Sequence, residues 1–540
     1  MKSSAIKHSC TRAARLLLAA ALGLACLLAQ HHEDSGLPES FNEPMPLYEK
    51  ALGDFSRPIS SSNKEAQAYY DQGFQMMYAF ATRDATRSFR EAQKRDPECA
   101  ICYWAEAWSW GSYLNGPMSK DNAPHAYTAI QKALELAPDY ADERERAFIE
   151  AMAVRYVEDF DPEKRREQDE PYAEAMREVY ERYPDDLDAG TLYGEALFLL
   201  EPRRGERDIH SPSVKRLHEV LEGVLAKDIR HVGACHLYIH ATESTVDPGK
   251  AEACSEFIGT SIPGASHINH MPSHTWNEIG RWGDSVRANL MAWHSDLKAE
   301  IDEGFAIYPS HNLHMLLFAA SMDGQGAIAI QAGKDFAKLT ESNIFHLLTL
   351  VRFGRFDEVL ELIDRPDGDG EAIDSGVWDF AHGYAQLRQG EIDFARAHLN
   401  RLVESSYASE QFRRHNACDL LGSLAWILRG EIRRAEGDVE GAIRALRMAN
   451  VTYRGLEYDE PEPLPFAAGH WYGAILLEAE RYAEAEEVYR EELRDHPHNG
   501  WSLFGLQQAL EGQGKTDQAV DADFEASWAR SDTWIRGSRF

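Results

Sequence analysis

The sequence predicts an all-α protein in which pairs of helices stack into a repeat array. One observation is a spaced pattern of small and aromatic residues that recurs along the chain. A second is a proline that closes several copies of the pattern, as expected where a helix ends. The third is a composition of 44% hydrophobic and 27% charged residues, which is typical of a folded soluble protein. At 540 residues the chain is long enough for such an array.

The repeated pattern is a small residue, then an aromatic residue or Gly, then Ala-x-x-x-aromatic-x-x-Ala-x-x-x-x-Pro. Residues 66–97 carry it clearly, with Gly73, Ala85, Phe89 and Pro97. Further copies lie at 120–138, 376–405, 423–452, 466–497 and 500–527. The pattern resembles the tetratricopeptide repeat (TPR), a 34-residue helix–turn–helix unit, over most of residues 64–530. This resemblance implies an α-solenoid, a right-handed superhelix of helix pairs.

The patterns divide the chain into six segments. They are a signal peptide (1–29), a flexible N-terminal segment (30–63), N-terminal repeats (64–200), His-rich repeats (201–340), C-terminal repeats (341–530) and a tail (531–540).

The N-terminus predicts export to the periplasm or the extracellular space. Basic residues from Lys2 to Arg15 precede the apolar run Leu16–Ala29, which is too short to span a bilayer. Cleavage near Ala29 would release a soluble protein, whereas lipid attachment at Cys26 would hold it at a membrane surface. No other segment is apolar enough to span a membrane, so we expect no membrane span.

The net charge is −33, from 56 Lys and Arg against 89 Asp and Glu. Such a surface repels nucleic acid and attracts cations, so we exclude a nucleic-acid partner. Export also permits disulfides among the five cysteines that follow the signal segment. We expect a local Cys99–Cys102 bridge and a Cys235–Cys254 bridge between adjacent helices. The odd count leaves Cys418 free, and we expect it to be a small buried residue.

Histidines gather between residues 231 and 314, which hold nine of the 22. Seven of these nine histidines, together with Glu243, form three groups. The spacing within each group places its members on one face of a helix. The groups are His236–His240–Glu243, His267–His270–His274 and His311–His314. Neutral imidazole is the commonest transition-metal ligand, so three such faces turned toward one another would make a metal site.

The repeat register predicts that these faces do meet. With Ala251, Gly280 and Gly324 as anchors, the groups take positions 2, 5, 9 and 12 of three successive first helices. In the TPR family these positions line the concave groove. The preceding repeat places Asp188 and Glu195 there as additional ligands or hydrogen-bond partners of ligands.

Pro272 interrupts the second group, since proline inside a helix removes a hydrogen bond and clashes with the preceding turn. Either the helix kinks there, or it starts near Met271 and leaves His267 and His270 on the entering loop.

The strings "HLYIHATE", "SHINHMPSHTW" and "HNLHM", with "DPECAICYWAEAWSWG" and "NGWSLFGLQQAL", resemble a group of exported bacterial TPR proteins. That group carries blocks of the form HxYIHxxE, GHxxHMPxH and HNxH. The resemblance to it implies no particular activity. Ser266 stands where the group usually has Gly. The resemblance implies these metal ligands: His236, His240, Glu243, His267, His270, His274, His311 and His314.

This ligand set favours Zn, Cu, Fe or Mn over Mg²⁺ and Ca²⁺, which prefer oxygen, and it leaves one or two ions open. The first hypothesis is a metalloenzyme, an oxidoreductase or hydrolase, with Glu243 as ligand or general base. The second is a metal carrier without turnover. The third is a metal-free scaffold that binds a peptide or partner protein in the groove.

Other features receive ordinary structural interpretations. The aromatic run Tyr103–Gly111 is expected to pack between helices, and the acidic runs Val157–Glu163 and Tyr458–Pro463 to form solvated loops. Five lone histidines are expected to be ordinary polar or packed side chains: His231, His294, His346, His382 and His470.

Overall fold

The computed structural model describes residues 37 and 39–540, apart from 203–204, 302 and 369. The chain forms two units, residues 1–46 and 47–540. In the first, the described part holds one short 3-10 helix, Glu39–Asn42. The predicted signal peptide and Cys26 lie outside the described residues. Among the residues described, no helix combines the length and apolarity needed to cross a membrane.

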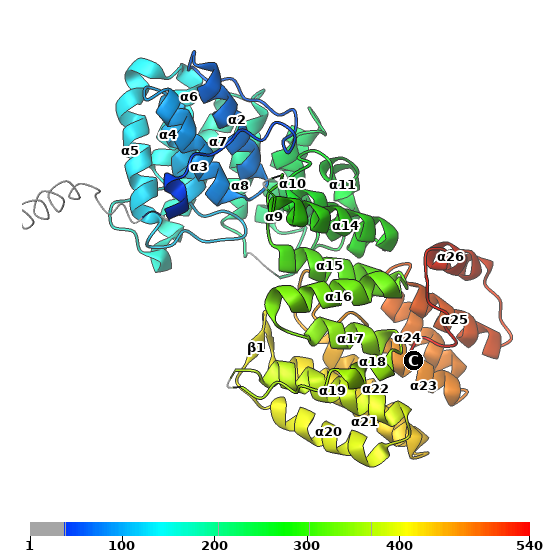
Figure 1. Ribbon diagram of the computed structural model, residues 1–540. Coiled ribbons are helices and arrows are strands. Elements are labelled where there is room, and N and C mark those ends of the chain that lie inside the picture. The colour runs from blue at the N-terminus through cyan, green and yellow to red at the C-terminus, as the bar shows by residue number, and fades with distance from the viewer. Residues whose placement is uncertain (1–36, 38, 203–204, 302, 369) are drawn as a thin grey trace, which may run out of the picture. The chain divides into compact units, whose positions relative to one another are not determined.

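The second unit is an array of helix pairs, which confirms the predicted all-α TPR solenoid (Figure 1). The N-terminal helices are α2 (Lys64–Tyr78), α3 (Thr82–Arg95), α4 (Ala100–Trp110), α5 (Ala123–Tyr140), α6 (Glu143–Ala153), α7 (Arg166–Arg182), α8 (Leu187–Phe198) and α9 (Pro212–Leu225). The central helices are α10 (Val232–Thr242), α11 (Glu252–Ile258), α12 (Ser266–His270), α13 (Pro272–Glu278), α14 (Trp282–Ala299), α15 (Pro309–Met322) and α16 (Gly326–Thr340).

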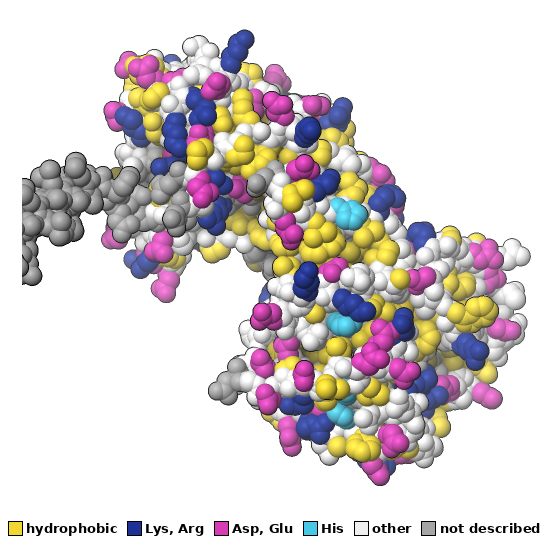
Figure 2. Space-filling view, viewed as in Figure 1, with side chains coloured by type: hydrophobic (Ala, Val, Ile, Leu, Met, Phe, Trp, Pro, Cys, Tyr) yellow, Lys and Arg dark blue, Asp and Glu magenta, His cyan; other side chains and the backbone are white. Residues whose placement is uncertain are grey.

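The C-terminal helices are α17 (Ile344–Arg352), α18 (Phe356–Glu361), α19 (Ala372–Arg388), α20 (Ile392–Ser405), α21 (Ala417–Ala435), α22 (Val439–Arg454), α23 (Gly469–Glu478), α24 (Tyr482–Asp495), α25 (Gly500–Gly512) and α26 (Gln518–Trp528). A short hairpin, β1 (Gln411–Phe412) and β2 (His415–Asn416), precedes α21. Carboxylate side chains are spread among lysines and arginines on the face shown in Figure 2 rather than gathered in one patch.

The small residues of the repeat lie where two helices cross. A Cβ atom on Gly73 of α2 would lie 2.5 Å from the ring of Phe89 on α3. The same relation holds between Gly473 of α23 and Tyr489 of α24, at 2.3 Å. Because packed interiors leave no room for an added methyl group at such a distance, the aromatic residue requires the glycine opposite it.

The C-terminal repeats return to the central ones. The Trp501 indole on α25 donates to the carbonyl of Ser321 on α15, at 2.9 Å. Arg530, after α26, pairs with the buried Asp323 at 2.6 Å. Residues 180 and 207 positions apart in the chain therefore meet at the C-terminal end of α15. This return brings the segment between α22 and α23 to the histidine-bearing helices.

Two segments outside the repeats pack onto the array. Within the segment predicted to be flexible, Arg57 pairs with Asp186 at 2.9 Å and Asp188 at 2.5 Å. Residues 47–63 are thus held by a buried ion pair that local sequence does not reveal. In the tail, Ser538 accepts a hydrogen bond from Arg352 of α17 through its carbonyl, at 3.2 Å.

The cysteine predictions are confirmed in part. Cys99 is bonded to Cys102, and Cys235 of α10 to Cys254 of α11. Cys418 is free as predicted, but it is exposed rather than buried. It lies in the first turn of α21, where its neighbours Ala417 and Leu420 take the inward positions.

Replacing Gly473 by Ala should lower stability by about 1–3 kcal/mol, because the added methyl group meets the Tyr489 ring. Gly422 in α21 is the matched control, since nothing lies within 4 Å of an added Cβ there. Gly422→Ala should raise stability by about 0.5–1 kcal/mol through helix propensity. Thermal unfolding followed by circular dichroism measures both, and equal Tm shifts would contradict the packing explanation.

Candidate metal centre

Three helical segments supply the predicted ligands. His236 and His240 lie on α10, with Glu243 at its C-terminal cap. α12 and α13 carry the second group, and α15 carries the third. The helix is divided at Met271, yet Met271 keeps helical dihedral angles (φ −50°, ψ −38°), and its N–H bonds the carbonyl of His267 at 3.1 Å. The structure therefore has the first of the two expected arrangements, a helix interrupted near Pro272. His267, His270 and His274 all lie on helical backbone on either side of the interruption.

Six histidines form two groups of three. In each group, one ring nitrogen from every member lies within 4.8 Å of the others. The inner group is His236, His240 and His267; the outer group is His270, His274 and His311. All are buried except His311, which is half-buried. A further set within the same limit contains His240, Glu243, His274 and Glu460.

Hydrogen bonds fix which nitrogen of three imidazoles carries the proton. His236 Nδ1 lies 2.6 Å from the carbonyl oxygen of Tyr78, which can only accept. The Glu243 carboxylate lies 2.8 Å from His240 Nδ1 and 2.5 Å from His274 Nδ1. Each Nδ1 therefore donates, so in the neutral form of each ring Nε2 presents a lone pair. This is how metal-binding histidines are oriented by a carbonyl or carboxylate behind them.

The Nε2 atoms also lie at distances suited to a shared ion. His236 Nε2 is 3.1 Å from His267 Nε2, and His274 Nε2 is 3.2 Å from His270 Nε2. Two nitrogens that bind one zinc ion at its usual bond length are roughly 3.3 Å apart at a tetrahedral angle. Each pair can therefore bind one ion with little movement.

Burial keeps these imidazoles neutral. It is the main cause that lowers the pKa values of His236, His267, His270 and His311 well below the ordinary value. Neighbouring imidazoles lower them further, because two adjacent rings cannot both be charged without repulsion. The rings are thus in their ligand form at neutral pH.

His314 lies outside both groups of three. Its ring stacks on Phe345 with centroids 4.0 Å apart, and its Nδ1 accepts a hydrogen bond from Arg413 at 2.9 Å. A guanidinium beside this nitrogen opposes a metal ion there. Of the eight predicted ligands, the structure thus brings together seven.

Asp188 and Glu195 also lie outside the groups of three. Asp188 binds Arg57 and accepts from the Tyr78 hydroxyl. Glu195 accepts from the Trp108 indole at 3.0 Å, and burial raises its pKa to about 7. Asp188 is connected to the centre indirectly. It accepts a hydrogen bond from the Tyr78 hydroxyl, and the carbonyl of the same Tyr78 orients His236.

Aromatic rings enclose the inner group on one side. Phe80 lies against His236 with ring centroids 4.1 Å apart, and Tyr308 meets His267 at 5.2 Å. The Tyr308 hydroxyl is hydrogen-bonded to that of Tyr113 at 2.8 Å. These residues come from distant segments, so the spacing of the histidines gave no sign of them.

A loop from the C-terminal repeats closes another side, and it corrects a prediction. The run Tyr458–Pro463 was expected to be solvated, but Asp459 and Glu460 are only 4% and 6% exposed. Arg413, between β1 and β2, donates to Asp459 Oδ1 and to the Glu460 carbonyl, both at 2.7 Å. This buried ion pair folds the acidic run inward, and Glu460 is the carboxylate that sequence analysis missed.

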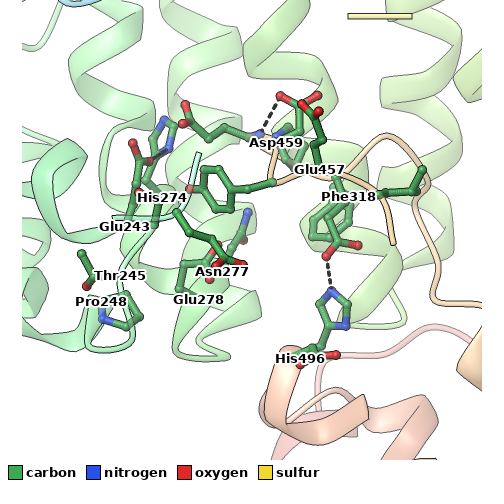
Figure 3. A pocket seen from close by; sticks show the side chains of 18 of the residues that line it. Glu243, Thr245, Pro248, His274, Asn277, Glu278, Phe318, Glu457, Asp459 and His496 are labelled. Atoms are coloured by element: carbon green, nitrogen blue, oxygen red, sulfur yellow. Dashed lines mark hydrogen bonds and ion pairs between the residues drawn. The ribbon is translucent and has the colours of Figure 1, made fainter. Parts of the chain in front are cut away.

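A cavity of about 850 Å³ adjoins the centre at Glu243 and His274 (Figure 3). Glu278 of α13 also lines it. Burial and the neighbouring carboxylates Glu462 and Glu243 raise the pKa of Glu278 to about 8. The cavity therefore has an excess of negative potential beside the histidines.

No protein-family model matches the chain, and no curated protein is similar to it in sequence. Among solved structures, yeast Tom70 is 14% identical, with 88% of this chain and 93% of that chain covered and a TM-score of 0.26. Human IFIT1 with PPP-AAAA is 9% identical, covering 87% and 91%, at 0.30. The P58(IPK) TPR domain is 10% identical, covering 83% and 98%, at 0.22. With scores this low, the fold class rests on the helix pairs of this chain itself.

Replacing Arg413 by Met should release the loop over the centre. Loss of the guanidinium beside buried Asp459, which also contacts His415 at 3.3 Å, should cost about 3 kcal/mol. Hydrogen–deuterium exchange should then rise in residues 456–463. Arg414→Met is the control, because its pair with the exposed Glu457 contributes at most about 1 kcal/mol. Unchanged exchange in Arg413→Met would show that the ion pair does not hold the loop.

Proposed function

We propose that this protein binds transition-metal ions through the two groups of three histidines. The observation that carries the proposal is the set of Nδ1 hydrogen bonds to Tyr78 and Glu243. They direct the Nε2 lone pairs of His236 and His274 at the Nε2 atoms of His267 and His270. Without an ion, packing six imidazoles together carries a desolvation cost that their function must offset.

The donor set favours Zn, Cu, Fe or Mn. Neutral ring nitrogens suit these ions, whereas Mg²⁺ and Ca²⁺ require oxygen donors. Three protein ligands per ion leave a coordination position for water or a substrate, as in catalytic zinc sites. This feature favours a metalloenzyme, an oxidoreductase or hydrolase, over a carrier in which all positions are filled by protein.

Glu243 serves both groups. Its two oxygens accept the Nδ1 protons of His240 in the inner group and His274 in the outer group. In this arrangement the carboxylate orients one ligand of each ion and increases the basicity of both. We infer a positioning role for Glu243 rather than the general-base role that the sequence also allows.

We propose that the protein acts after export, as residues 1–29 predict. The disulfides Cys99–Cys102 and Cys235–Cys254 are compatible with an oxidising compartment. A metal-free scaffold that binds a peptide or partner protein stays the alternative prediction. It would need groove surface beyond that already covered by the Asp459–Glu460 loop and the Ser538 segment.

Protein purified without a His tag should contain about two equivalents of transition metal, one per group of three. The double variant His240→Ala/His270→Ala removes one ligand from each group and should lose most of it. His314→Ala is the control and should keep its metal. Mass spectrometry of metal content gives the result; less than about 0.2 equivalents in the unaltered protein would refute the metal site.

Glu243→Gln should weaken metal binding by about 10- to 100-fold. Glutamine replaces one of the two carboxylate oxygens by an NH2 donor, so the imidazole that contacts that oxygen, His240 or His274, loses its acceptor. Competition with a chromophoric chelator measures the affinity. Glu222→Gln on α9 makes the same change outside the centre, at a residue that accepts from Tyr238, and should leave the affinity unaltered.

A further inference from the structure

The cavity beside the centre is strongly acidic. Three of its lining residues are arginines, and nine are carboxylates: Glu206, Asp208, Glu243, Glu278, Glu457, Asp459, Glu460, Glu462 and Asp495. Some are already neutralised, since Asp495 pairs with Arg454 at 3.3 Å and Asp459 with Arg413. Glu278 is different: among the described residues it has no ion-pair or hydrogen-bond partner. Figure 3 shows it on the cavity wall near Asn277, on the same side as Glu243 and His274.

The histidines by themselves do not balance the charge of a metal ion. Six neutral imidazoles add no negative charge, so the charge of two divalent ions must be offset by other groups. The acidic cavity supplies such groups next to the ligands. On the side of His311 and His314, burial is the main cause that lowers the pKa of both rings, and the Arg413 guanidinium, which also pairs with Asp459, lowers it further. The carboxylates that line the cavity outnumber its arginines, so a cation is attracted through the cavity.

One set of side chains connects the cavity to both groups of histidines. His240, Glu243, His274 and Glu460 place one ligand atom each within 4.8 Å of one another. Glu243 and His274 face the cavity, while His240 belongs to the inner group and His274 to the outer group. An ion held by this mixed set can pass to either group by exchanging a carboxylate for an imidazole.

We propose that the acidic cavity is the access route for divalent transition-metal ions, and that Glu278 attracts them toward the mixed set of His240, Glu243, His274 and Glu460. This inference rests on the proposed function. Burial, and after it the neighbouring carboxylates Glu462 and Glu243, raise the pKa of Glu278 to about 8, and a cation that arrives there relieves the repulsion among these carboxylates and favours the ionised form of Glu278.

The test is the rate at which Co²⁺ binds the full-length metal-free protein, followed by the visible absorption of the bound ion. The variants are Glu278→Gln and the double variant Glu278→Gln/Glu457→Gln, neither of which removes a ligand. Glu511→Gln on α25 is the control, since it removes one charge from the same chain outside the cavity lining. It corrects for attraction by the overall charge of −33.

At about pH 8.5 and about 10 mM ionic strength, where Glu278 with its pKa of about 8 is mostly ionised, association should slow by about three- to ten-fold in the Glu278 variants and stay unchanged in Glu511→Gln. At about pH 7 the single variant Glu278→Gln should differ less from the unaltered protein, because Glu278 itself is mostly protonated there. The difference should disappear at about 0.5 M salt, where exposed charges are screened. The amount of Co²⁺ bound at saturation should equal that of the unaltered protein, which also shows that the variants fold.

Two results overturn the proposal in distinguishable ways. Normal Co²⁺ binding with equal rates in all variants would reject the cavity as the route and leave the metal site intact. Absence of Co²⁺ binding by the unaltered protein would reject both the metal site and the route. If the Glu278 variants do not fold, the rate in Glu457→Gln and its salt dependence decide instead, since equality with Glu511→Gln contradicts steering by the cavity.

Discussion

The Glu243 carboxylate connects the two halves of the histidine cluster, because it accepts one hydrogen bond from His240 on α10 and one from His274 on α13. These two hydrogen bonds engage Nδ1 of each ring, so that Nε2 is the atom that would bind a metal. They also hold α10 and α13 in one orientation at the C-terminal cap of α10. The cavity, the loop that carries Glu460 and both groups of three histidines are arranged around this residue.

Burial of the histidine cluster carries a desolvation cost, and the surrounding aromatic rings determine which protonation state is buried. Phe80 and Tyr308 exclude water from the inner group, and this favours neutral imidazole over imidazolium. Low local polarity also strengthens any interaction between a cation and Glu243 or Glu460. An enclosed cluster of this kind would thus bind a cation strongly through groups that are mostly uncharged, at the expense of the packing that a purely apolar core provides.

The sequence predicts those features that depend on neighbouring repeats. Glycine and aromatic spacing reveals the helix crossings, because Gly73 must lie opposite Phe89 in the same repeat. The register of successive first helices likewise brings His240 near His274. The sequence does not predict those features that depend on contact between the C-terminal and the central repeats. Glu460 and Asp459 are folded inward by Arg413, almost 50 residues earlier in the chain. A charged run with prolines looks the same whether it is solvated or paired, so local pattern cannot distinguish the two.

The inward fold of Asp459 and Glu460 divides the enclosure of the cluster between two parts of the chain. Every histidine of both groups lies at or before residue 311, whereas Arg413 and the loop that carries Glu460 lie more than 100 residues later. A change confined to the C-terminal repeats can therefore uncover Glu243 and His274 while all six imidazoles stay in place. Because burial keeps neighbouring imidazoles neutral, the protonation state of the cluster depends on C-terminal repeats that contribute none of the imidazoles.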